Sequence, residues 1–353
     1  DQTLNLIERL EFRFWRIYKK WTHKSGMKYP LTLSWKASHM LKKSVRENSP
    51  DLVISIFHSF LTHPLKNCPA VWYFDTTFLG QEAFWPQYGW LALRLTVWQE
   101  KRALRNAAAV ITNSEWSKSV LDHDYHEDTS KVTVFPMPSA LPVTLTAIQG
   151  VWQEQPITLP VRLLIVARVF QRKGVDLAIE TVAKLNAMGI PARLRVCGLS
   201  EKPDQAIPFV EFSGPYRKSD PVELAEYLAE YKQAHFLIHP ARFEAAGIAP
   251  AEAAAFGTPT ITNDSGGLGT SVKDGVSGVV LPSGSPPEAY AHVVADLVND
   301  PDRYLALRRS TRRRYEEELN WEVAGRRLSE ILEGVVKAHA ESACTSAQRK
   351  KGL

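Results

Sequence analysis

The sequence predicts an α/β protein of two domains, each built on a doubly wound parallel sheet. The chain has 353 residues, more than one hydrophobic core usually serves. In both halves, short β-branched runs alternate with segments of helical spacing, and this alternation is typical of parallel sheets. A stretch rich in Pro, Ser and Thr at 137–160 separates the halves, as a linker would.

Four apolar runs predict the strands of the first half, at 51–57, 70–74, 108–114 and 131–136. Helical spacing lies before and between them, at 5–24, 31–48, 90–106 and 115–122. The first of these helices carries a basic and aromatic run, EFRFWRIYKKW (11–21). That run fits either a helix lying in a membrane interface or a helix that packs its aromatic side chains inward.

The second half repeats this rhythm. Strands are predicted at 161–169, 192–198, 235–240, 258–264 and 278–282, and helices at 174–188, 221–233, 249–256, 286–299, 301–318 and 322–340. The polar tail is predicted to be disordered. The expected division is therefore 1–150 and 151–320 for the two domains, 321–341 for a C-terminal helix and 342–353 for the tail.

The composition of the chain disfavours several classes of function. No apolar run approaches the roughly 18 residues of a membrane-spanning helix. The three cysteines are widely spaced without a CxxC motif, which disfavours a disulfide framework or a structural zinc site and fits a reducing cytosol. The net charge of +5 suggests an anionic partner such as a phosphate ligand or a membrane surface. Nucleic acid is disfavoured because the basic residues are interspersed with acidic ones.

Two glutamates follow the predicted strand 235–240. Glu244 falls in the loop after the strand and Glu252 in the first turn of the next helix. Between them, the amides of Gly247 and Ile248 are free donors at a helix N-terminus, where phosphate binds well. A ligand could place its phosphates on these amides and its hydroxyls on the two carboxylates. A capping glutamate and a solvated one remain the alternative.

A basic loop follows the strand at 161–169. Arg168 and Lys173 fall at the carboxyl end of the domain's first strand, where ligands of open α/β sheets bind. A guanidinium fork and an ammonium together neutralise a diphosphate. Arg172 is expected to be solvated, and a wholly solvated loop is the alternative.

Gly266 and Gly267 follow the strand at 258–264. Glycine at such a position lets backbone approach a ligand closely. A plain turn is the alternative.

Three segments in this order, RVFQRKG (168–174), FEAAGIAPAEAAAFGTPTI (243–261) and SGGL (265–268), resemble the retaining glycosyltransferases of family 4, also called group 1. The resemblance covers residues 50–340. It implies the GT-B fold, in which two Rossmann-like domains face a cleft. It also implies transfer of a sugar, with retention and without a metal or other cofactor, from a nucleotide-diphosphate sugar to a saccharide or lipid-linked hydroxyl. Members of this kind serve envelope polysaccharide or glycolipid synthesis in the cytoplasm, with peripheral contact at the inner membrane face.

The resemblance also implies roles for particular residues. Arg168 and Lys173 would hold the diphosphate, and Glu252 would bind the ribose hydroxyls. Glu244 would contact the donor sugar and stabilise the charge that develops at its anomeric carbon. The remaining donor contacts would come from Gly247, Ile248, Gly266 and Gly267 around the phosphates and sugar, and from Gly214 and Tyr216 near the base.

In the first half, Asp75 and His58 are the candidate catalytic residues. Both follow predicted strands and would face the cleft. Asp75 stands near a position where the family commonly has histidine, so its role as acceptor base or orienting group stays open. His58 could position acceptor or sugar, or it could be structural, as His63 and His239 are expected to be.

The sequence departs from the family pattern at its start. No strand, glycine-rich turn and helix precede DLVISIF (51–57), so we expect a fragment with an incomplete N-terminal sheet. A non-catalytic sugar-nucleotide-binding module and a GT-B epimerase stay open as alternative functions. The intact set of Arg168, Lys173, Glu244 and Glu252 favours catalysis.

Overall fold

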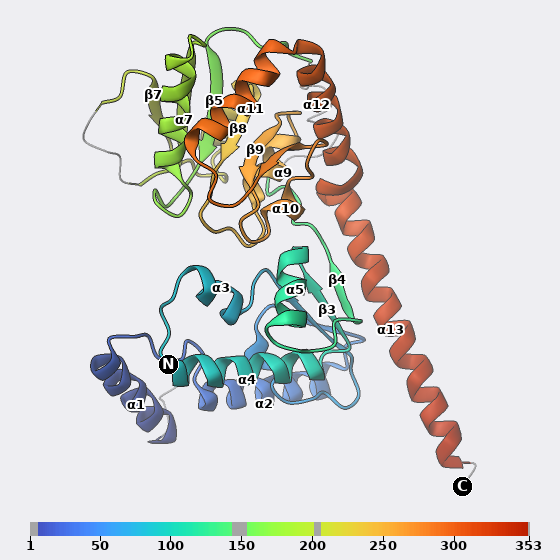
Figure 1. The fold of residues 1–353 in the computed structure, drawn as a ribbon. Coiled ribbons are helices and arrows are strands. Elements are labelled where there is room, and N and C mark those ends of the chain that lie inside the picture. The colour runs from blue at the N-terminus through green and yellow to red at the C-terminus, as the bar shows by residue number, and fades with distance from the viewer. Residues whose placement is uncertain (1–5, 143–153, 201–205, 352–353) are drawn as a thin grey trace. The chain divides into compact units, whose positions relative to one another are not determined.

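The computed structural model describes residues 6–142, 154–200 and 206–351 (Figure 1). The chain forms two compact units, each with its own parallel sheet. The first unit comprises Asp1–Phe135 together with Arg327–Leu353, and the second comprises Pro136–Arg326. The C-terminal helix therefore begins in the second unit and continues, from Arg327 on, in the first. Part of the predicted linker, 143–153, lies outside the described residues.

The first sheet consists of β1 (Val53–Ser55), β2 (Ala70–Phe74), β3 (Ala109–Thr112) and β4 (Val132–Val134), paired in parallel in the order β1-β2-β3-β4. Each strand thus lies beside its neighbour in sequence. The reversal of strand order that defines a doubly wound sheet does not occur among the described strands of this unit. The predicted positions of all four strands are confirmed.

Five described helices lie in the first part of this unit: α1 (Leu6–Thr22), α2 (Leu31–Asn48), α3 (Phe78–Phe84), α4 (Trp90–Asn106) and α5 (Glu115–His123), with a 3₁₀ turn at His58–Leu61. Helices α2 to α5 pack on the sheet through a core that includes Trp72, Leu104, Val110 and Leu121. Helix α1 belongs to a separate cluster with α4. The short helix α3 was not predicted.

The second sheet has six parallel strands in the order β10-β9-β8-β5-β6-β7. These are β5 (Val161–Val166), β6 (Ala192–Cys197), β7 (Val210–Ser213), β8 (Phe236–His239), β9 (Thr260–Asn263) and β10 (Gly278–Leu281). The first strand of the unit, β5, is central, and the order reverses between β5 and β8. This is the doubly wound order that the sequence predicts. Only β7 was missed, because it is a short edge strand that carries the charged Glu211.

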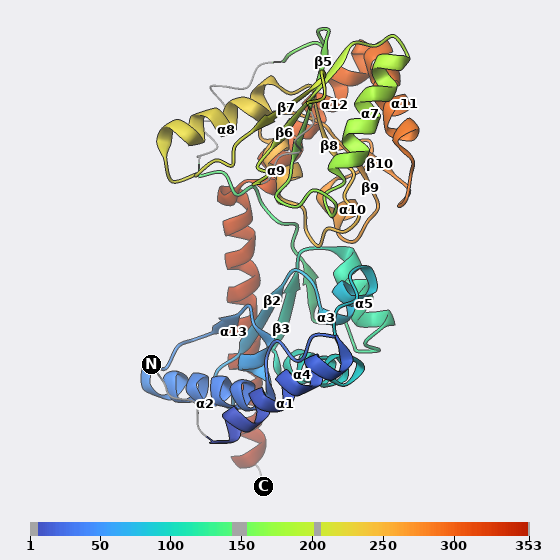
Figure 2. The same ribbon diagram turned by 90° about the vertical axis from the view of Figure 1, so that its left-hand side faces the viewer.

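Two layers of helices cover the second sheet (Figure 2). Side chains alternate along β5, so Leu163 and Ile165 join one core and Leu164 joins another. Helices α7 (Val175–Ala187) and α11 (Pro287–Asn299) pack on the first core, and α8 (Pro221–Gln233) and α9 (Ile248–Ala254) on the second. The other helices described in this unit are α10 (Leu268–Ser271) and α12 (Pro301–Arg314), with a π turn at Tyr315–Leu319.

The last helix, α13, runs over Trp321–Lys351 (Figure 1). The tail predicted to be disordered from residue 342 is therefore helical as far as Lys351. The physical reason is composition, since residues 342–351 contain several good helix formers and neither glycine nor proline. Among the described helices, none has an apolar stretch sufficient to cross a bilayer.

Candidate active site

The loops after β5 and β8 meet where the order of the second sheet reverses. Gly174, with φ of +69°, ends the loop after β5, and a Cβ added there would overlap the carbonyl oxygen of Pro240 in the turn after β8. Only glycine allows this close approach. The approach brings Lys173 beside His239 and Glu244, so two loops separated by some 70 residues of chain build one cluster.

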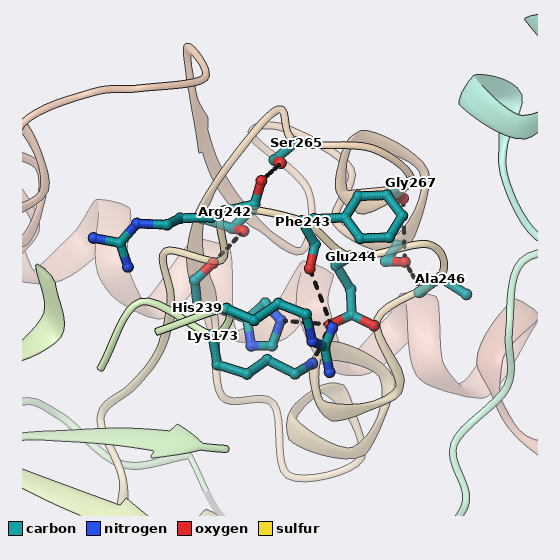
Figure 3. Close-up of polar contacts among 11 residues, drawn as sticks. Lys173, His239, Arg242, Phe243, Glu244, Ala246, Ser265 and Gly267 are labelled. Atoms are coloured by element: carbon teal, nitrogen blue, oxygen red, sulfur yellow. Dashed lines mark hydrogen bonds and ion pairs between the residues drawn. The ribbon is translucent and has the colours of Figure 1, made fainter. Parts of the chain in front are cut away.

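Four charged or titratable side chains form this cluster, called here the Glu244 cluster (Figure 3). Oε2 of Glu244 accepts a hydrogen bond from the ammonium of Lys173, lies 3.3 Å from Nη1 of Arg172 and lies 3.8 Å from Nε2 of His239. The side chains of Lys173 and Glu244 are only 14% and 15% exposed. The contacts are thus largely shielded from water, which strengthens them.

Burial and charge set the protonation states of the Glu244 cluster. Burial alone would raise the pKa of Glu244, but His239 and Lys173 outweigh it and hold the pKa well below its usual value. Burial, followed by the charge of Lys173, lowers the pKa of His239. The Glu244 cluster thus combines two basic side chains, Arg172 and Lys173, with a single carboxylate. An excess of basic over acidic groups suits an anionic ligand.

Of the two basic residues predicted to hold a diphosphate, only Lys173 contacts Glu244. Arg172 contacts it as well and also donates to the carbonyl of Phe243 at 3.2 Å. Arg172 is therefore not the solvated side chain that the sequence suggested. Arg168 is exposed and has no hydrogen bond or ion pair with the described residues. Its assignment to a diphosphate stays a prediction. His239, expected to be structural, is fully buried and lies 3.8 Å from Oε2 of Glu244.

Glu252 belongs to a separate, more deeply buried cluster. It is 2% exposed, and its Oε2 accepts hydrogen bonds from the hydroxyls of Tyr227 and Tyr231 at 2.5 and 2.7 Å. Burial, followed by the charge of Glu252, raises the pKa of both tyrosines, so both act as donors. The other oxygen, Oε1, lies 2.5 Å from Nζ of Lys218, which is 36% exposed. The carboxylate thus presents Oε1 toward the more accessible side.

The predicted glycines also lie near Glu244. Gly267 donates its amide to the carbonyl of Glu244 at 2.8 Å, as Figure 3 shows. Gly266 has φ of +62°, and a Cβ there would overlap the same carbonyl oxygen. Gly247, also with φ of +62°, precedes α9, and the following Ile248 is 42% exposed. The turn after β9 and the start of α9 therefore border the Glu244 cluster.

Gly214 and Tyr216 lie in the loop after β7. Gly214 has φ of +67° and precedes a cis peptide bond to Pro215. The hydroxyl of Tyr216 donates to Glu230 at 3.0 Å. Because all six strands are parallel, this loop and those after β5, β8 and β9 emerge at the same edge of the sheet.

Three buried arginines of α12 bind backbone carbonyls at the ends of α9 and α10, the helices that adjoin these loops. Arg308 donates to the carbonyl of Phe256 at 3.0 Å, and Arg312 donates to the carbonyl of Ala255. Arg314 donates to the carbonyls of Thr270 and Ser271, both at 2.8 Å. These carbonyls lie at the C-terminal ends of α9 and α10, so the arginines satisfy acceptors that the short helices leave open.

Comparison with known proteins decides the family. A family model described as glycosyl transferases group 1 matches residues 153–314, and one described as glycosyltransferase family 4 matches residues 8–138. Between them they cover both sheets. The chain belongs to the group 1 glycosyltransferases. The resemblance seen in the three loop segments is therefore confirmed.

Among curated relatives of this transferase family, D-inositol 3-phosphate glycosyltransferase 1 from Catenulispora acidiphila is 34% identical over 158 residues. The match covers 41% of this chain and 38% of that relative, so the chain spans well under half of the relative's length. A sucrose-phosphate synthase from Thermosynechococcus elongatus has a TM-score of 0.64 at 20% identity, over 87% of this chain and 79% of that one. Anabaena Alr3699/HepE in complex with UDP-glucose has a TM-score of 0.60 at 16% identity, over 84% and 82%. These solved structures confirm the GT-B fold.

The two candidates in the first unit lie after neighbouring strands of its sheet. His58 is 4% exposed, and its ring centroid lies 5.1 Å from that of Tyr29 and 5.8 Å from that of Phe78. Burial lowers the pKa of His58 to about 4, so the imidazole is neutral at pH 7. Asp75 is exposed, and its Oδ1 accepts the amide of Thr76 at 2.7 Å. No contact joins His58 and Asp75 among the described residues.

A buried carboxyl group near Asp75 was not predicted. Glu100, on α4, is 1% exposed and accepts the amide of Phe78 at 3.1 Å and the hydroxyl of Tyr125. It therefore anchors the start of α3, directly after the Asp75 loop. Burial raises the pKa of Glu100 to about 8. The helical spacing of α4 gave no sign of this, because an isolated glutamate in a helix usually faces solvent.

The DHD sequence at 122–124 matches a metal-binding pattern of other sugar transferases, but Asp122 and Asp124 are both exposed at the end of α5. Their side chains are therefore solvated. In the described ranges, no three His, Cys, Asp or Glu side chains gather as ligands of a metal ion would.

Proposed function

We propose that this chain transfers a sugar from a nucleoside-diphosphate sugar to an acceptor hydroxyl, with retention of configuration and without a divalent metal. The Glu244 cluster is the observation that supports this proposal. It places two cations around one carboxylate where the strand order reverses. Ligands of doubly wound sheets bind at this point.

The chemistry follows from where charge develops. Breaking the bond between the anomeric carbon and the diphosphate oxygen leaves positive charge on the sugar ring and additional negative charge on the diphosphate. Lys173 and Arg172 are already held close together by Glu244, so they are preorganised to stabilise that negative charge. The diphosphate would take over part of their hydrogen bonding, and the Glu244 carboxylate would face the sugar, where positive charge builds.

The proton and the new bond can be accounted for without a protein nucleophile. In the proposed front-face reaction, the acceptor oxygen bonds to the anomeric carbon on the side that the diphosphate leaves. The acceptor's proton passes to the departing diphosphate oxygen. The configuration at the anomeric carbon is thereby retained.

Glu252 would bind the ribose hydroxyls of the donor. Its Oε2 is occupied by Tyr227 and Tyr231, which leaves Oε1 for ribose hydroxyls once Lys218 shares or releases it. The loop of Gly214 and Tyr216 would lie near the base. UDP-glucose is the first donor to test, because the HepE structure contains it.

The acceptor side is assigned to the first unit, with Asp75 as orienting group or base and the neutral His58 as a positioning group. A saccharide or lipid-linked acceptor of envelope polysaccharide or glycolipid synthesis fits this family. The proposed location is the cytoplasm, at the inner face of the membrane.

A donor-based experiment tests the proposal without knowledge of the acceptor. Thermal shifts with UDP-, GDP- and ADP-sugars identify the donor, and chromatography then follows its hydrolysis and any acceptor product. Lys173→Met should lower the rate at least about tenfold, since a charge-assisted hydrogen bond contributes about 1.5–3 kcal/mol. The matched control is Lys184→Met on α7, because Lys184 pairs only with the exposed Glu288 in the described part of the chain.

Several results would count against the proposal. Equal rates in the two lysine variants would exclude the Glu244 cluster as the site. Loss of activity in EDTA with recovery on Mn²⁺ or Mg²⁺ would refute the metal-free mechanism. Donor binding without turnover would favour a binding module, and release of an epimeric nucleotide sugar would identify an epimerase.

A further inference from the structure

Helix α1 turns its acidic residues toward the protein. Glu8 is 1% exposed and lies 3.3 Å from Nζ of Lys36. Glu11 accepts the backbone amides of Leu31 and Thr32 at 2.7 and 2.9 Å. Both carboxylates of α1 therefore contact residues of α2.

The same side of α1 carries its packed aromatic residue. Trp15 is 7% exposed and packs with Met27 and with Ala92 of α4. Within the described residues, the side chains of α1 that contact α2 and α4 therefore come from one face of the helix, and most of its other side chains are exposed.

The exposed surface of α1 includes two stripes. Seven large apolar side chains of α1 are exposed, and Trp21 is the most exposed of them at 85%. Six of the seven form the first stripe: Leu6, Ile7, Leu10, Phe14, Ile17 and Trp21. At the helical repeat of about 100° per residue, these six fall within an arc of about 100°, whereas Phe12 lies outside it. Beside this arc lie four exposed basic residues, Arg9, Arg13, Arg16 and Lys20.

We propose that this outer face of α1 docks on the surface of an anionic lipid bilayer. An apolar stripe of this width can enter the boundary between headgroups and acyl chains while the helix lies flat. The basic stripe would then meet lipid phosphates, and because Glu8 and Glu11 are engaged elsewhere, no carboxylate of α1 opposes that attraction. Trp21, at the end of the helix, has an amphipathic ring that suits the interface.

A second copy of the chain is a poorer occupant of this face. The spacing of Ile7, Leu10, Phe14, Ile17 and Trp21 also matches a coiled-coil seam. However, α1 has 17 residues, fewer than the three or so heptads that a stable seam requires. A two-fold pairing through this face would also bring identical basic stripes together.

The docking inference deepens the proposed function, since a lipid-linked acceptor would lie in the same surface. Its test is separate, because vesicle binding is measured without any donor. The full 353-residue chain is sedimented with vesicles of phosphatidylcholine alone and of phosphatidylcholine with phosphatidylglycerol. We expect binding to the anionic vesicles only, and weaker binding as salt is added.

Two variants with matched controls locate the surface. Leu10→Ser should lower the partition coefficient about tenfold, whereas Val222→Ser on α8, which is 69% exposed, should not change it. Arg16→Glu should lower it at least about fivefold, whereas Arg313→Glu, an exposed position on α12, should have little effect. Unchanged melting temperatures will show that all four variants are folded, as expected for exposed positions.

Three outcomes would overturn the inference. One is no binding to anionic vesicles, and another is equal loss of binding in a variant and its control. The third is a dimer in solution that Leu10→Ser dissociates, because this would make a second copy the occupant of the face.

Discussion

Gly174 offers the sharpest test of how the second unit builds its site. The residue precedes α7, has φ of +69°, and a Cβ there would overlap the carbonyl oxygen of Pro240. Gly189 follows the same helix with φ of +79°, and a Cβ there would meet nothing within 4 Å. Gly174→Ala and Gly189→Ala therefore both place alanine at a positive φ. Only Gly174→Ala adds the overlap with the carbonyl oxygen of Pro240.

The expected free energies of unfolding separate the two variants. A left-handed alanine costs about 1–2 kcal/mol, of which about 0.4–1 kcal/mol is offset by the reduced entropy of the unfolded chain. Gly189→Ala should therefore lose about 1 kcal/mol. Gly174→Ala should lose about 1–3 kcal/mol more, the usual cost of backbone shifts that relieve overpacking. For a unit of this size, the extra loss lowers the melting temperature by about 2–12 °C.

The overlap should also affect the site, since Lys173 directly precedes Gly174. A shift of the loop after β5 would move Lys173 away from Glu244. Calorimetric melting and titration with the nucleotide sugar identified by thermal shift check both effects in each variant. Similar melting temperatures and similar donor affinities for the two variants would refute the proposed packing of this loop on Pro240.

Two further predictions concern buried polar groups. Tyr231→Phe removes one of the two hydroxyls that donate to Oε2 of Glu252. It should therefore raise the KM for the donor several-fold and change kcat less. An effect on kcat alone would contradict this positioning role. Burial raises the pKa of Glu100 from 4.5 to about 8, so folding favours the protonated form of this side chain. The stability contributed by the protonated form is fully present below pH 4.5 and is lost as the pH rises toward 8. Glu100→Gln, which cannot ionise, should therefore become more stable relative to the natural chain between pH 5 and 8, as thermal melts over that range will show; a difference independent of pH would contradict the assignment.

Much of the architecture could be read from local patterns. The strands of both units, apart from the charged edge strand β7, appear as β-branched runs because buried parallel strands are apolar on both faces. The loop residues Lys173 and Glu244 were found because ligand sites of this topology follow strands at their carboxyl ends. The same rule pointed to Gly266 and Gly267, and in the structure the amide of Gly267 donates to the carbonyl of Glu244.

The sequence by itself thus determined the class of fold and the loops that carry the candidate site, because periodicity and strand ends are local properties of the chain. Only the tertiary structure decided that Arg172 rather than Arg168 reaches Glu244, and that two tyrosines of α8 hold Glu252. These pairings depend on where separate loops and helices cross, and the close approach of Gly174 to Pro240 is one such crossing. A linear pattern records which residues face inward, but not which inward-facing residues meet.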